Sequence, residues 1–156
     1  MIRPESLPEV LPEVLHGGLI AHRHAGFWRG VLIEGPSGAG KSDLALRALD
    51  AGFRLVADDR VVAFTSGGRL WGKAHETLAG LLEIRGLGVT PTPALAFCEI
   101  ALLIRCVATP EAVERLPDPQ SATILGVSIP VFDLWPREPA ALAKVGRMLQ
   151  SLGVPS

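Results

Sequence analysis

GPSGAGKS, residues 35–42 of the chain, comprises Gly35, Pro36, Ser37, Gly38, Ala39, Gly40, Lys41 and Ser42. It fits the phosphate-binding pattern G-x-x-x-x-G-K-[ST] at every fixed position, a match that arises by chance in roughly 0.5% of chains of this length. Its glycines let successive backbone N–H groups turn inward and form an anion-binding nest at a helix N-terminus. Lys41 would supply a charge to the outer phosphates and the Ser42 hydroxyl a ligand for Mg²⁺. The stretch therefore predicts a nucleoside triphosphate site.

The segments that flank this stretch have the order that the pattern requires. Residues 30–34 are a short apolar run that ends at the glycines, as a buried strand would. Residues 42–51 place Leu44, Ala45 and Ala48 on one helical face, and Gly52 follows as a stop signal. Residues 54–57 read as a second buried strand. Strand, glycine turn and helix together support the motif.

The remaining pattern predicts more strands than helices. We expect strands at residues 14–21, 61–64, 69–71, 81–84 and 99–107, and a strand pair in 122–131. We also expect a hairpin connection at 22–30, loops at 91–93 and 110–119, an extended lead-in at 1–13 and a terminal helix at 139–152. The turns of the two strand pairs would lie at Gly67-Gly68 and at Gly126. These elements predict one α/β P-loop domain with a mixed sheet over residues 1–156.

Composition narrows the class of protein. Of 156 residues 48% are hydrophobic and 20% charged, which excludes wholesale disorder. Fifteen Lys and Arg against sixteen Asp and Glu give a net charge of −1, which argues against nucleic acid or a membrane surface as partner. No signal-peptide or bilayer-spanning pattern is visible, so we expect a soluble, cytoplasmic protein. Cys98 and Cys106 would lie about 26 Å apart on one strand and are expected to be free, buried thiols.

Acidic residues at strand ends are the candidates for metal binding and proton transfer. Asp58 and Asp59 directly follow the strand at 54–57, at the edge where ligands bind in an open parallel sheet. Phosphoryl transfer needs an acidic metal ligand and a base near the attacking hydroxyl. Glu83 and Arg85, two apart in LLEIRGLG, place charges in an apolar strand, which favours a site role over a surface ion pair.

Several segments in order resemble the catalytic domain of the HPr kinase/phosphorylase family. They are VLHGGLI, GPSGAGKSDLAL, GFRLVADD and LLEIRGLGV, which span residues 14–90, with fainter similarity to Arg115 in ERLP and to residues 125–131. The short length is similar to proteobacterial forms that lack the family's N-terminal domain.

The resemblance implies a phosphoenolpyruvate-carboxykinase-like fold, a hexamer and a serine of the phosphotransferase-system carrier HPr as substrate. It implies that residues 35–42 hold ATP, that Ser42 and Glu83 hold Mg²⁺, and that Asp59 is the base, which leaves Asp58 for the metal side. His16 and Arg115 would complete the catalytic site around the phosphates. Phosphorylase activity is not expected, because residues 129–131 are followed by no basic residue until Arg137.

Two other functions stay open from the residues. A small-molecule P-loop kinase would need an arginine-rich lid, and the chain has only single arginines after residue 42. An ATP-binding regulatory module without turnover would need the glycine-rich stretch but not the acids. We expect a Mg²⁺- and ATP-dependent serine kinase.

Overall fold

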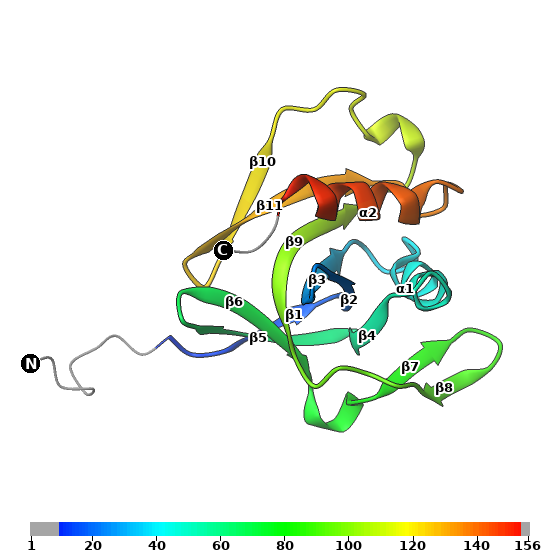
Figure 1. Ribbon diagram of the computed structural model, residues 1–156. Coiled ribbons are helices and arrows are strands. Elements are labelled where there is room, and N and C mark those ends of the chain that lie inside the picture. The colour runs from blue at the N-terminus through cyan, green and yellow to red at the C-terminus, as the bar shows by residue number, and fades with distance from the viewer. Residues whose placement is uncertain (1–9, 154–156) are drawn as a thin grey trace, which may run out of the picture.

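The computed structural model describes residues 10–153 of the chain (Figure 1). Its elements are β1 Glu13–His16, β2 Gly18–His24, β3 Phe27–Glu34, α1 Lys41–Asp50, β4 Arg54–Ala57, β5 Arg60–Ser66, β6 Arg69–Ala74, η2 Glu76–Leu78, β7 Leu81–Ile84, β8 Gly88–Pro91, β9 Cys98–Cys106, η3 Pro110–Ala112, β10 Gln120–Ile124, β11 Val127–Leu134 and α2 Ala141–Ser151. Among these residues no helix is long and apolar enough to cross a membrane.

A mixed nine-stranded sheet forms the centre of the fold. Seven strands follow one another in the order β1-β5-β6-β9-β3-β2-β4, and β11 with its neighbour β10 joins through β9. β3 and β11 both run parallel to β9, while the other pairs in this sheet are antiparallel. The α/β class with a mixed sheet is thus confirmed, and the carboxyl ends of three parallel strands meet at one edge.

Alternation along the central strands divides the core into two parts. Val31 and Ile33 of β3 pack with the helices α1 and α2, whereas Leu32 between them packs with β5, β6 and β11 on the other side. A strand buried on both faces reads as a continuous apolar run, which is why residues 30–34 carried no alternation. Both helices therefore lie on the same side of the central strands (Figure 1).

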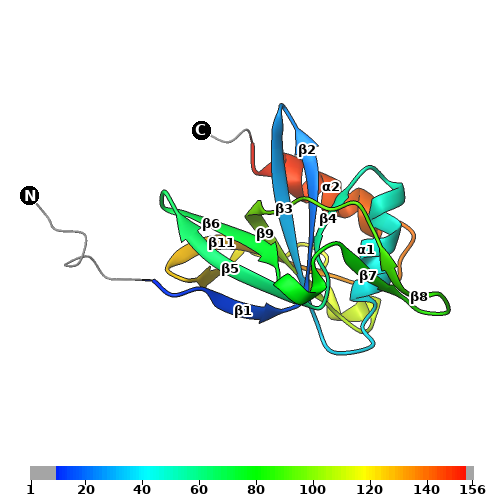
Figure 2. The same ribbon diagram turned by 90° about the horizontal axis from the view of Figure 1, so that it is seen from below.

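The N-terminal part of the sheet differs from the sequence prediction. One strand at residues 14–21 was wrong, because the chain breaks at Gly17: β1 pairs with β5, and β2 with β3 and β4. The hairpin connection expected at 22–30 joins the predicted strands but is shorter, since β2 and β3 continue to a turn at Ala25 and Gly26, where φ is 50° and 83°. Positive φ at both turn positions suits a tight hairpin, which extends beyond its neighbours in Figure 2.

Other segments agree more closely with the prediction. The strands at 54–57 and 81–84 have the expected bounds, and the turns at Gly67-Gly68 and Gly126 join the expected pairs. Residues 88–91 pair with β7 as β8, a strand that the sequence did not predict, and this small hairpin stands apart from the main sheet (Figures 1 and 2). The terminal helix covers 141–151, and most of the predicted lead-in lies outside the described residues.

A buried arginine holds the end of the terminal helix. Arg29 of β3 is 5% exposed and donates to the carbonyl oxygens of Leu149, at 3.1 Å, and of Gly153. A cation suits this end of α2 because the last carbonyls of a helix carry the negative end of the helix dipole. This contact fixes α2 against the hairpin.

Candidate active site

The glycine loop, residues 35–42, connects β3 to the first turn of α1. Gly38 and Gly40 have φ of 82° and 104°, in the left-handed region that side chains disfavour. Gly40 caps α1, and its carbonyl accepts from the Leu44 N–H at 2.9 Å. A Cβ at Gly35 would lie 2.9 Å from the Cβ of Cys106, so the start of the loop packs on the end of β9. These glycines permit the close turn that the sequence motif predicts.

The Lys41 side chain folds over this loop. Its Nζ donates to the carbonyl oxygens of Gly35 and, at 3.3 Å, of Pro36. Burial raises the pKa of the Cys106 thiol to about 11, although the nearby charge of Lys41 acts in the opposite direction. The ammonium group therefore lies at the carboxyl edge of the parallel strands, where the motif expects phosphates.

Asp58 brings together three segments that are distant in the sequence. Its Oδ1 accepts from the Ser42 hydroxyl at 3.3 Å, and its Oδ2 accepts from the Glu83 backbone N–H at 3.2 Å. Burial raises the pKa of Asp58 above 3.8, and the hydrogen bonds from Glu83 and Ser42 lower it by less than burial raises it. One half-buried carboxylate thus links the glycine loop, the end of β4 and the start of the β7–β8 hairpin.

Asp59 has a different environment from its neighbour. It is exposed, its φ is 68°, and no described residue donates a hydrogen bond to its carboxylate. Its backbone oxygen accepts from the Gly17 N–H at 3.0 Å, directly after His16 at the end of β1. The turn at Asp58-Asp59 therefore separates a carboxylate that contacts the glycine loop from one that is exposed and accepts no hydrogen bond from the described residues.

Gly17 places the backbone at His16 beside this turn and next to the end of β3, from which the glycine loop starts. A Cβ at Gly17 would overlap the backbone oxygen of Ile33, two residues before Gly35. The 18 residues between His16 and Gly35 form the β2–β3 hairpin, which leaves the site and returns to it. The long connection thus keeps His16 near the loop and near Asp59.

The predicted residues Glu83 and Arg85 both belong to the small hairpin. Glu83 is exposed in β7, and its backbone joins Asp58. Arg85 lies just beyond β7 in the turn to β8, so the two do not share a strand face, and no ion pair joins them in the described region. The backbone of Glu83 thus lies beside Asp58, and the role of its side chain stays a prediction.

Arg115 lies elsewhere along the same edge. It lines a pocket with residues of β11 and α2, and none of the lining residues belongs to the glycine loop. The loop instead contacts residues that the sequence did not single out for this role. Arg137 donates to the Gly38 oxygen at 3.1 Å, and Arg47 of α1 holds the neighbouring segment by donating to the Pro136 oxygen. The available signal was the position of Arg137 after a strand that ends at this edge.

The oxygen donors around Ser42 fit a magnesium ion. No group of three or more His, Cys, Asp or Glu side chains in residues 10–153 could hold a metal by itself. Mg²⁺ in phosphoryl-transfer sites, however, uses one or two carboxylates together with substrate phosphates and water. The Ser42 hydroxyl and the Asp58 carboxylate, already in contact, supply hard oxygen ligands of this kind.

Residues 12–143 match the family described as the HPr Serine kinase C-terminal domain. The chain belongs to this family. It is 36% identical over 120 residues to the HPr kinase/phosphorylase of Clostridium tetani, which covers 76% of this chain and 38% of that protein. It is 56% identical over 61 residues to the HPr kinase/phosphorylase of Streptococcus thermophilus, 38% of this chain and 20% of the relative.

A solved structure described as the Hpr(Ser) kinase/phosphatase from Coxiella burnetii has a similar fold. The TM-score is 0.74 at 26% identity, over 90% of this chain and 93% of that one. The chain therefore spans well under half the length of the curated relatives named above but nearly all of this structure.

Proposed function

We propose that this chain is a Mg²⁺- and ATP-dependent kinase that phosphorylates a serine of HPr or of an HPr-like carrier. The family match supports this, and one observation carries it: the Asp58 carboxylate joins Ser42 of the glycine loop to Glu83 of the β7–β8 hairpin. A glycine loop alone explains nucleotide binding. A carboxylate held at its Ser42, here that of Asp58, is what phosphoryl transfer requires in addition.

In the proposed reaction the glycine loop and Lys41 hold the phosphates of ATP. The serine hydroxyl oxygen bonds to the γ-phosphorus of ATP, and the Asp59 carboxylate accepts the hydroxyl proton. The bond between the γ-phosphorus and the bridging β-phosphate oxygen breaks at the same time, so ADP leaves. Ser42, Asp58 and Glu83 would hold Mg²⁺, which neutralises charge on the phosphates. The backbone at His16 lies beside that of Asp59, and we assign the His16 side chain to completing the site around the phosphates.

The proposal covers kinase activity without phosphorylase activity. The segment after β11 has no basic residue before Arg137, and the Arg137 side chain donates to the Gly38 carbonyl oxygen. The assembly of the chain as a hexamer is part of the same proposal.

Transfer of ³²P from γ-labelled ATP, with and without purified HPr, tests the function. Labelling of HPr at serine, dependent on Mg²⁺, supports the kinase. Nucleotide binding without transfer to HPr would favour a regulatory sensor, and labelling of small molecules alone would favour a small-molecule kinase. A variant of HPr with alanine at the target serine is the matched control.

A further inference from the structure

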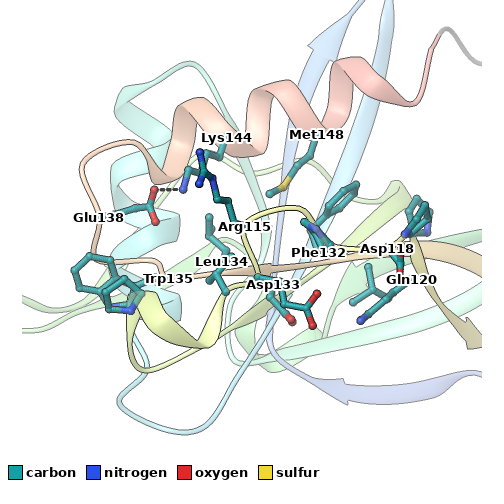
Figure 3. Close-up of a pocket in the computed structure, with 17 residues that line it drawn as sticks. Arg115, Asp118, Gln120, Phe132, Asp133, Leu134, Trp135, Glu138, Lys144 and Met148 are labelled. Atoms are coloured by element: carbon teal, nitrogen blue, oxygen red, sulfur yellow. Dashed lines mark ion pairs between the residues drawn. The ribbon is translucent and has the colours of Figure 1, made fainter.

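A pocket of about 610 Å³ lies between β11, α2 and residues 110–119 (Figure 3). Its volume falls within the range of about 300–1,000 Å³ that is typical of small-molecule sites. Phe132, Leu134 and Met148 give it apolar walls, while Arg115, Lys144 and Asp133 add charge. Such a mixture suits a ligand with a flat apolar part and several polar groups.

The charged groups of the pocket are not all paired with one another. Lys144 forms an ion pair with Glu138 at 2.5 Å, and Arg115 reaches the same region from the opposite segment (Figure 3). The half-buried carboxylate of Asp133 forms no hydrogen bond or ion pair with any residue between 10 and 153. A free carboxylate of this kind is a good acceptor for sugar hydroxyls, as in dinucleotide sites.

Residues 135–138 form a wall between this pocket and the glycine loop. Trp135 and Glu138 line the pocket. Between them, Pro136 would contact a Cβ at Gly40 at 3.4 Å, and Arg137 donates to Gly38. The pocket and the loop therefore adjoin through one four-residue segment.

The topology places both at the same edge of the sheet. β9 pairs in parallel with β3 on one side and with β11 on the other, in a register that keeps their carboxyl ends level. The loop follows β3 and the wall follows β11, so about 10 Å of sheet separates them. That separation is comparable to the distance from the inner phosphates of a nucleotide to its base.

One polar atom in the wall lacks a partner. The indole Nε1 of Trp135 is buried and donates to no described residue. An unpaired buried donor costs about 1–3 kcal/mol, so the wall carries an unsatisfied hydrogen-bonding group that is closed to solvent, and the assignment below does not depend on it.

We propose that this pocket holds the nucleoside part, base and ribose, of the nucleotide whose phosphates lie on the glycine loop. The base packs among Trp135, Phe132 and the apolar walls, and Asp133 accepts from the ribose hydroxyls. The inference rests on the proposed function, because it extends the same nucleotide beyond its phosphates.

Calorimetric titration with Mg²⁺-ATP and with Mg²⁺-tripolyphosphate tests this assignment. Met148→Trp fills the pocket and is expected to raise the Kd of ATP at least about tenfold. The Kd of tripolyphosphate should change by less than about twofold. Arg147→Trp, on an exposed neighbouring position of α2 outside the pocket, is the matched control and leaves both ligands unchanged. Equal effects of Met148→Trp on both ligands would overturn the inference.

The two proposals fail in different ways. If neither ligand binds the wild-type protein, the proposed function fails; if both bind and the pocket variant discriminates neither, only the nucleoside assignment fails. Should Met148→Trp not fold, Asp133→Asn serves instead: wild type should prefer ATP to its 2′,3′-dideoxy analogue, and the variant should lose that preference. Retained preference, or a raised KM for HPr with unchanged ATP affinity, would contradict the inference.

Discussion

Replacing Asp59 with Asn removes the proposed base and little else. The side chain is exposed and accepts no hydrogen bond from the described residues, so the isosteric amide loses no partner in the fold. The backbone bond from Gly17 to the Asp59 oxygen does not involve the side chain. The free energy of unfolding should therefore change by less than about 0.5 kcal/mol, the usual range for surface substitutions.

The effect on phosphoryl transfer should be far larger. General-base assistance contributes about 10²–10⁴-fold, and an amide cannot accept the serine proton. We expect single-turnover transfer to HPr to fall at least about 10²-fold, with nucleotide affinity changed by less than about threefold.

Asp58→Asn provides the matched comparison. An Asn at this position can still accept from the Glu83 N–H with its oxygen and donate to the Ser42 hydroxyl with its amide, so the fold is retained. It loses a charged oxygen beside Ser42, and the variant should need more Mg²⁺ while keeping more activity than Asp59→Asn at saturating metal. Rapid-quench transfer and a fluorescent-nucleotide titration measure both. If Asp58→Asn is inactive at saturating Mg²⁺ and Asp59→Asn is active, the two roles are reversed.

Four further outcomes are expected. Lys41→Ala should abolish transfer and weaken ATP binding in a titration, and an unchanged rate would refute the phosphate site. Glu83→Gln should raise the Mg²⁺ requirement without changing the thermal midpoint; the opposite pattern would make Glu83 structural. The pKa of Asp58 in the folded protein lies above its ordinary value of 3.8. The free energy of unfolding of the wild type should therefore fall, relative to that of Asp58→Asn, as the pH rises from about 3.8 through the raised pKa. Urea unfolding at several pH values measures this difference. Arg29→Met should lower the free energy of unfolding by about 1–3 kcal/mol through the lost cap of α2, also measured in urea.

The local sequence pattern was sufficient to predict the bounds of strands that are continuous and end at a sharp change of composition. Residues 54–57 and 81–84 were placed correctly because apolar runs there end at sharp composition changes. The break at Gly17 escaped prediction because VLHGGLI reads as one strand, and only the close approach of the Ile33 oxygen requires a glycine there. The hairpin between β2 and β3 was expected, but its arms were predicted too short because its exposed tip carries polar and aromatic residues that alternate weakly.

In the candidate site, too, the sequence predicted the features that depend on local pattern and not those that depend on tertiary packing. The glycine loop and the acids at 58–59 follow from spacing and from the rule on strand ends. Their distinct environments do not, because the contacts of Asp58 with Ser42 and Glu83 depend on how the hairpin at 81–91 packs. Arg115 gave no signal of its pocket, since its neighbours there come from β11 and α2, later in the chain.

The central position of β9 also has a consequence for the order of folding. This strand pairs with β6, β3 and β11, and its last residue, Cys106, packs against Gly35. A chain emerging from the ribosome exposes the apolar edge of β3 until β9 follows, long after residues 35–42 have been made. Because such distant pairing must precede a stable core, folding should be slow, and nascent chains that end before residue 98 should be substrates for chaperones.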